Sequence, residues 1–281
     1  MLARHLFLSL ILSASAGLAD DVIDRSGSWD VNGPLGESGE LKLSVDEGTW
    51  MNLDVHPDGK SIVFDLLGDL YLMPVSGGEA KQLTTGAAYD IQPRFSPDGD
   101  RILFTSDRGG LSTLWIADFD GEELSEIHVL IEGKANTWGS GSWDDSGDWI
   151  FARKRQTDVS SIGISELWMF HRNGGSGVKL VADGAEVASF SASNDGRYLY
   201  YGASGPFSYE RDPYTAVWSV NRYDRKTGEK RVVSAGNGSS ATPMVSPDGK
   251  SIAFLRRVGS ATTLWIHNPC NRCRTANLGW S

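Results

Sequence analysis

Short apolar runs separated by polar turns recur five times between residues 49 and 266. Each repeat has a run rich in β-branched and aromatic residues, followed by a second run with an aliphatic-aromatic pair such as Leu70-Tyr71 or Leu114-Trp115. Residues of these types favour strands, and no helical period competes with the pattern. The chain is therefore predicted to be all-β.

The turn before each repeat carries the clearest local signal. In His56-Pro57-Asp58-Gly59, proline presets φ near about −65°, aspartate can bond the backbone two residues on, and glycine accepts positive φ. Pro97-Asp98-Gly99 and Pro247-Asp248-Gly249 repeat this device, and Asp145-Ser146-Gly147 and Asn194-Asp195-Gly196 keep part of it. The turn glycines are separated by 40, 48, 49 and 53 residues. This period indicates a β-propeller of four-stranded antiparallel blades with five recognisable units.

The repeats divide the chain into four predicted segments. Residues 1–19 form a signal peptide, residues 20–48 an N-terminal segment that can supply a ring-closing strand, residues 49–266 the propeller, and residues 267–281 an off-pattern tail. After Leu264-Trp265-Ile266 the polar turn of the other repeats is missing. We therefore expect the fifth sheet to stop before its fourth strand and the ring to be incomplete.

The first 19 residues have the pattern of a secretory signal. Arg4 and His5 precede an apolar run, Leu6 to Leu12, and small residues follow it up to Ala19. The run is shorter than the roughly 20 residues that span a bilayer. The pattern predicts an exported chain, periplasmic or secreted, with no membrane span after signal removal.

Composition narrows the choice of partner. The 281 residues include 26 lysines and arginines and 36 aspartates and glutamates, a formal net charge of −10. A surface of that sign repels phosphate backbones, so we expect no nucleic-acid partner.

In an up-and-down meander, alternate connections lie on opposite edges of the sheet. The Asp-Gly and Gly-Gly turns then share one edge, and the connections between second and third strands share the other. The stretch from Gly202 to Thr215 is the richest of these second connections. It is a candidate binding loop through Phe207, Tyr209, Glu210, Arg211 and Tyr214; an ordinary surface insertion is the alternative.

Catalytic signals are sparse in the sequence. The five histidines lie far apart, and neither a His-x-His pair nor a Gly-x-Ser-x-Gly elbow occurs. Two carboxylate clusters, Asp118 to Glu123 and Asp144 to Asp148, could hold Ca²⁺ or be solvated turn residues. Cys270 and Cys273 form one Cys-x-x-Cys pair, which favours a local disulfide or an accident of the tail. We expect no catalytic residue, metal or cofactor in this chain.

The motif Ser96 to Phe104, together with Leu114-Trp115-Ile116, Gly77-Gly78 and Leu83-Thr84, resembles the TolB-like propeller family. The segments Gly48 to Val55, Phe64 to Tyr71 and Gln92 to Gly110 are similar, more narrowly, to the N-terminal propeller of exported metal-dependent amidohydrolases. That resemblance implies a hydrolase barrel, and its divalent metal, which are missing here, and so a truncated or frame-shifted copy.

Two functions follow from these resemblances. The first is a non-catalytic scaffold or interaction region whose partner is its own missing catalytic domain. The alternative is a stand-alone periplasmic propeller, similar to TolB, that binds other envelope proteins. A chain that is itself a hydrolase is the third and weakest hypothesis.

Overall fold

A computed structural model describes residue 31 and residues 44–131, 136–156, 165–181, 186–204, 217–236, 238–268 and 276–278. These residues belong to one compact unit, residues 31–281. The described residues contain strands and turns and no helix, and therefore nothing helical of the length and apolarity that crossing a bilayer requires. The predicted all-β class is confirmed.

Five antiparallel sheets of four strands, here blades 1 to 5, follow one another in chain order. Blade 1 contains β1 (Leu53–Val55), β2 (Ser61–Leu66), β3 (Asp69–Pro74) and β4 (Lys81–Gln82). Blade 2 contains β5 (Ile91–Phe95), β6 (Arg101–Ser106), β7 (Thr113–Phe119) and β8 (Leu124–Val129). Blade 3 contains β9 (Asn136–Trp143), β10 (Trp149–Gln156), β11 (Ser165–His171) and β12 (Gly174–Val181). Blade 4 contains β13 (Val187–Ala192), β14 (Tyr198–Ser204), β15 (Trp218–Asp224) and β16 (Lys230–Ser234). Blade 5 contains β17 (Ser240–Val245), β18 (Ile252–Val258), β19 (Ala261–His267) and β20 (Ala276–Leu278).

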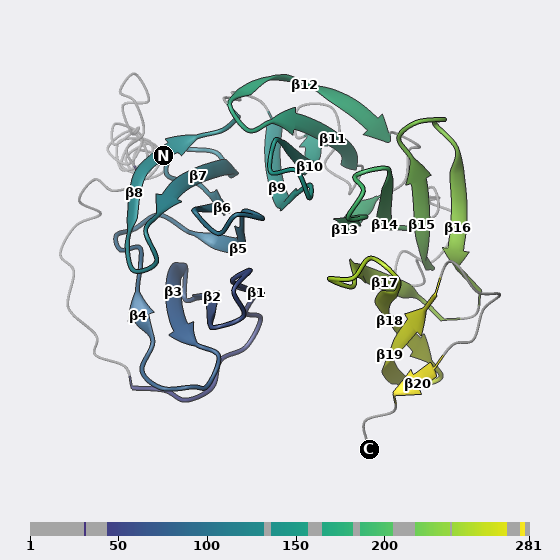
Figure 1. Cartoon of the computed structure of the whole chain (residues 1–281), viewed down its shortest axis with the longest axis horizontal. Coiled ribbons are helices and arrows are strands. Elements are labelled where there is room, and N and C mark those ends of the chain that lie inside the picture. Colours follow the sequence, from purple (N-terminus) through teal and green to yellow (C-terminus); the bar gives the residue numbers. More distant parts are fainter. Residues whose placement is uncertain are drawn as a thin grey trace, which may run out of the picture. The chain divides into compact units, whose positions relative to one another are not determined.

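The blades are arranged as a β-propeller, with the first strand of each blade innermost and the fourth outermost (Figure 1). Each blade is a simple meander, so its first and third connections reach one edge of the ring and its second connection reaches the other. We call these the turn edge and the loop edge. The expectation that the ring is incomplete between blades 1 and 5 stays a prediction.

The fifth blade differs from the expectation of a sheet that stops short. Ala276–Leu278 pairs antiparallel with β19, with Leu264 opposite Leu278 and Ile266 opposite Ala276. The fifth sheet therefore has its fourth strand. The expectation failed because the connection after His267 does not use the Asp-Gly signal of the other blades, although the chain still returns to the sheet edge.

The five turns that lead from first to second strands are built alike. Their glycines have φ between +64° and +83°, where a side chain is strained. A serine hydroxyl donates to the turn aspartate in three of them, as in Ser96 to Asp98 at 2.5 Å and Ser246 to Asp248 at 2.6 Å. In blade 1, His56 replaces the serine, and its ring packs edge-on against Phe95 at 4.9 Å between centroids. These bonds tie the innermost strand to the second strand.

The core lies between neighbouring blades, because alternate residues of each central strand point to opposite faces of its sheet. On β6, Ile102 and Phe104 pack toward blade 1 with Val63, whereas Leu103 packs toward blade 3. A third cluster joins blades 3 and 4 around Phe151 and Leu199. The blades thus stack face to face, and this stacking decides which turns of neighbouring blades lie close together at each edge.

Candidate functional site in the cleft between blades 3 and 4

Three turns meet at the turn edge where blade 3 faces blade 4. They are the β9–β10 turn with Asp144 to Gly147, the β13–β14 turn with Asn194 to Arg197, and the β15–β16 turn with Arg225 and Lys226. Between them lies a cleft of about 890 Å³. We call it the inter-blade cleft. Its other lining residues come from β10 to β12 and β15, and they are Trp149, Met169, Val178, Lys179, Leu180 and Tyr223.

Arg225 crosses the cleft from blade 4 to blade 3. Its Nη1 donates to the carbonyl oxygen of Gly196 at 2.6 Å, and its guanidinium carbon lies 5.3 Å from the centroid of the Phe151 ring. Nη1 also lies 3.7 Å from Oδ2 of Asp144, a carboxylate whose side chain is 5% exposed. A half-buried cation over an aromatic face is stabilised electrostatically, so Arg225 joins the two blades that border the cleft.

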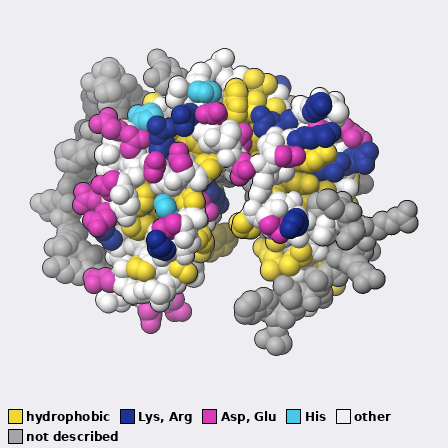
Figure 2. All heavy atoms as spheres, viewed as in Figure 1, with side chains coloured by type: hydrophobic (Ala, Val, Ile, Leu, Met, Phe, Trp, Pro, Cys, Tyr) yellow, Lys and Arg dark blue, Asp and Glu magenta, His cyan; other side chains and the backbone are white. Residues whose placement is uncertain are grey.

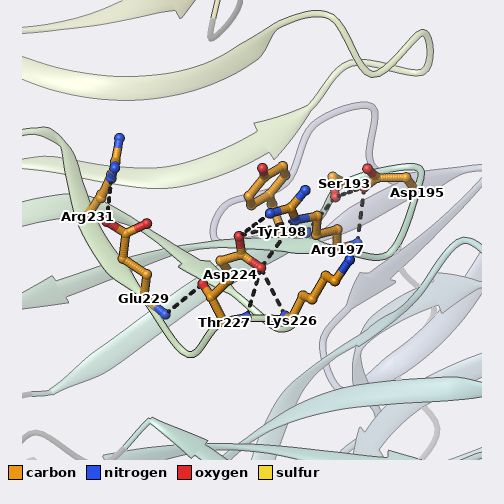
Figure 3. Close-up of polar contacts among 9 residues, drawn as sticks. All are labelled: Ser193, Asp195, Arg197, Tyr198, Asp224, Lys226, Thr227, Glu229 and Arg231. Atoms are coloured by element: carbon orange, nitrogen blue, oxygen red, sulfur yellow. Dashed lines mark hydrogen bonds and ion pairs between the residues drawn. The ribbon is translucent and has the colours of Figure 1, made fainter.

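A second guanidinium is held rigidly at the mouth. Arg197 binds Asp224 through Nη2 to Oδ2 at 2.7 Å and Nε to Oδ2 at 3.2 Å (Figure 3). Asp224 also accepts hydrogen bonds from the backbone amides of Lys226 at 2.9 Å and Thr227 at 3.3 Å. The bond from Arg197, more than these amides, lowers the pKa of Asp224 to about 2. The carboxylate is therefore charged at neutral pH and orders the β15–β16 turn.

Two further carboxylates border the cleft and differ in their surroundings. Desolvation, followed by the neighbouring charges of Asp144 and Asp195, raises the pKa of Asp145 above its ordinary value. The pKa of Asp195 is lowered, first by the hydrogen bond from the Ser193 hydroxyl at 2.5 Å. The Asp195 carboxylate thus accepts a hydrogen bond that favours its charged form, whereas burial and neighbouring like charge both disfavour the charged form of Asp145. A cationic group entering beside Asp145 would relieve that repulsion.

Charge is unevenly distributed over the blades. Figure 2 shows Asp and Glu gathered over blades 1 and 2, and Lys and Arg gathered over blade 4. Both signs of charge line the cleft, through Lys179, Lys226 and Asp145, together with the apolar side chains of Met169 and Leu180. Such a surface can bind a polypeptide segment that carries apolar and charged side chains.

The described residues that line the cleft carry charged, hydroxyl and apolar side chains. Within the described ranges, no group of three or more His, Cys, Asp and Glu side chains is placed to hold a metal ion. Among the described residues that line the cleft there is no histidine, cysteine or glutamate. Its hydroxyl group from Ser146 donates to Asp144 at 2.7 Å. The arrangement is suited to binding a charged ligand.

The structure places only some of the sequence-predicted residues. Gly147, Asp195 and Gly196 lie in or beside the cleft, although the sequence indicated them only as turn residues. The predicted binding loop, with Phe207, Tyr209, Glu210, Arg211 and Tyr214, lies outside the described residues, as do Cys270 and Cys273.

Sequence reasoning missed Arg197, Asp224 and Arg225. The available signal was a pair of arginines beside two turns of blade 4, with Arg197 after the Asn194 to Gly196 turn and Arg225 at the start of the turn to β16. It becomes meaningful only when both turns are placed on the same edge.

The family comparison agrees with this architecture. The model of the TolB beta propeller domain matches residues 42–209. A solved structure described as a putative TolB from Agrobacterium tumefaciens superposes with a TM-score of 0.65 at 15% identity, over 81% of this chain and 79% of that one. At such identity the superposition shows the fold.

Two curated relatives align over shorter stretches. The Tol-Pal system protein TolB of Wolinella succinogenes is 31% identical over 103 residues, which are 35% of this chain and 24% of that protein. Tricorn protease homolog 1 of Streptomyces coelicolor is 33% identical over 66 residues, 24% of this chain and 6% of that protein. The matched stretches span about a quarter or less of these relatives. On the family model, which covers more than half of its length, the chain belongs to the TolB β-propeller domain family.

Proposed function

We propose that this chain is an exported protein-binding propeller and that the inter-blade cleft holds a segment of another envelope protein. The observation that carries the proposal is the cleft itself: a volume of about 890 Å³ lined by apolar side chains, including Met169 and Leu180, and by Lys179, Lys226 and Asp145. Apolar contacts would supply affinity and the two signs of charge would fix the register of the segment.

The family supports the class of partner. The Wolinella relative is a Tol-Pal system protein, and we propose that this chain likewise binds a component of such a system. Export is supported by the apolar run Leu6 to Leu12, which Arg4 and His5 precede. N-terminal sequencing of the chain recovered from the periplasm of an expression host should begin near Gly17 or Asp20 if the signal is cleaved.

Binding can be tested with the purified chain and a purified Pal-type protein, using an unrelated exported protein as the reference. Lys226→Glu reverses an exposed charge at the mouth of the cleft and should weaken binding at least fivefold. Lys60→Glu makes the same change on a blade 1 turn, where Lys60 is 84% exposed, and should leave binding unchanged. Equal loss in both variants would contradict a role for the cleft.

A second candidate function is an accessory domain of a larger exported hydrolase, such as an amidohydrolase. The match to Tricorn protease homolog 1 supports it, because 66 residues of this chain resemble 6% of a far longer protein named as a protease homolog. In that setting the propeller would shield an active-site mouth or present substrate. The gene sequence beyond the codon for Ser281 tests this: codons for a His-x-His-bearing barrel would favour the accessory domain over the stand-alone propeller.

A further inference from the structure

The loop edge of blade 1 carries an exposed apolar surface. Trp50 is 99% exposed and Leu67 is 76% exposed, the two highest values among the large apolar side chains that the structure describes. Tyr89, just before β5, is also exposed. We call Trp50, Met51, Leu67 and Tyr89 the apolar rim.

The backbone brings these residues together. In the β1–β2 ladder Leu53 lies opposite Phe64, and the Asp65 amide donates to the Asn52 carbonyl at 3.1 Å. Trp50 and Leu67 therefore each lie two residues beyond this bonded pair, both at the loop edge. On the other side, a Cβ on Gly68 would lie 2.8 Å from Cδ2 of Tyr89, so Tyr89 packs against the turn that carries Leu67. The members of the rim thus share the loop edge where blade 1 meets the start of blade 2.

Both of the most exposed residues have strained backbones. Trp50 has φ +62° and Leu67 has φ +56°, a left-handed conformation that bulky residues rarely adopt and that costs about 1–2 kcal/mol per residue. Strain of this kind tends to occur at functional positions. At Leu67 the positive φ belongs to the two-residue loop Leu67-Gly68, because Leu66 pairs with Asp69 and such a hairpin requires positive φ at both loop residues. At both positions an apolar side chain is left in water, which burial within the chain does not explain.

The support under the rim is firm. Asp65, which is buried, accepts hydrogen bonds from the Asn52 amide at 2.7 Å, the Asn52 side chain at 2.9 Å and the Gln92 amide at 2.7 Å. This carboxylate joins the start of blade 1 to the start of blade 2. The strand that leads to Leu67 is thus tied to the starts of both blades, and an ordered backbone lowers the entropy lost on binding.

Charge around the rim points to the nature of its occupant. Asp46 and Glu47 are exposed shortly before Trp50, and Oδ1 of Asp107 accepts the Tyr89 amide at 2.8 Å. The neighbouring guanidinium of Arg108 is paired with the buried carboxylate of Asp90. Anionic lipid surfaces would be repelled by these carboxylates, and a second copy would bring like charges together.

We infer that the apolar rim binds a basic, apolar segment of a partner protein, with apolar side chains on Trp50 and Leu67 and lysines or arginines beside Asp46, Glu47 and Asp107. This surface lies on the loop edge, opposite the inter-blade cleft. It does not depend on the function proposed for that cleft, and one can fail while the other holds.

The test uses the full exported chain and a fluorescein-labelled peptide of alternating leucine and lysine, with glutamate replacing lysine in the control peptide. Fluorescence anisotropy should show at least tenfold tighter binding of the lysine peptide. Trp50→Gly and Leu67→Gly should each weaken that binding at least tenfold. Both variants should remain folded, because glycine accepts the positive φ of these positions.

A matched control removes exposed apolar surface elsewhere. Val232, on the outer strand of blade 4, is 64% exposed, and Val232→Ala should bind the lysine peptide as the wild type does. The proposal is overturned if neither peptide binds or if both peptides bind alike. It is also overturned if Trp50→Gly binds the lysine peptide as the wild type does, because binding would then reflect general attraction to a chain of net charge −10. Analytical ultracentrifugation could also overturn it: if the wild type sediments as a dimer and Trp50→Gly as a monomer, the occupant of the rim is a second copy of the chain.

Discussion

The two edges of the propeller are built from the same repeat but present different kinds of side chain. At the turn edge, charged side chains are held by many local bonds, as Asp224 is by Arg197 and two amides. At the loop edge of blade 1, apolar side chains are exposed on a strained backbone at Trp50 and Leu67. The comparison teaches that regular turns can build a polar cleft without strain, whereas an exposed apolar surface here coincides with departures from the repeat.

The largest expected effect concerns the carboxylate beneath the loop edge. Asp65→Ala would leave the two Asn52 donors and the Gln92 amide without their acceptor. Since an unsatisfied buried donor costs about 1–3 kcal/mol, we expect the free energy of unfolding to fall by about 3 kcal/mol in urea titration. Asp58→Ala, in an exposed turn, should change it by less than about 1 kcal/mol. Equal effects would show that Asp65 is not an anchor.

At the turn edge, Arg225 should matter for stability and Lys226 should not. Arg225→Ala removes the bond to Gly196 at 2.6 Å and the stacking over Phe151. We expect a loss of about 2 kcal/mol in the free energy of unfolding. Lys226→Ala, at the next and exposed position of the same turn, is the control. A loss with Lys226→Ala as large as with Arg225→Ala would contradict the inter-blade role of the guanidinium.

The charge of Asp224 predicts a dependence of stability on pH. Its pKa falls from 3.8 to about 2 on folding, first through the Arg197 bond. A depressed pKa contributes stability that is full above the unfolded value and is lost as pH falls from about 4 to about 2. Asp224→Asn should therefore lower Tm at pH 6, and the difference from the wild type should shrink over that interval. A difference that is constant from pH 6 to pH 2 would exclude this linkage.

The smallest effects should have opposite signs at two positions with similar backbones. Gly59 has φ +72° and open space where a Cβ would be, whereas Leu67 has φ +56°. We expect Gly59→Ala to reduce the free energy of unfolding by about 1 kcal/mol and Leu67→Gly to leave it unchanged or raise it by up to about 1 kcal/mol. Thermal unfolding by circular dichroism would measure both. A clear loss with Leu67→Gly would mean that its side chain stabilises the fold.

The repeat made the fold predictable, whereas the sites depended on how blades stack. The spacing of the turn glycines and the aromatic runs predicted five meanders, because turn residues and strand residues act locally. Arg225 and Asp144 are 81 positions apart in the sequence numbering, and only the packing of blade 3 on blade 4 brings them together. No residue type marks Trp50 or Leu67 as left-handed, since both are ordinary strand or core residues elsewhere.

A central strand such as β6 packs against two neighbouring blades, one on each face of its sheet. On β6, Leu103 and Phe104 are adjacent in sequence but pack into different interfaces. A single inserted or deleted residue within this strand would exchange the two sets of side chains and disturb both interfaces together. Length changes should therefore be tolerated in the connections and disfavoured in the central strands of blades 2 to 4, whose two faces pack against two neighbouring blades.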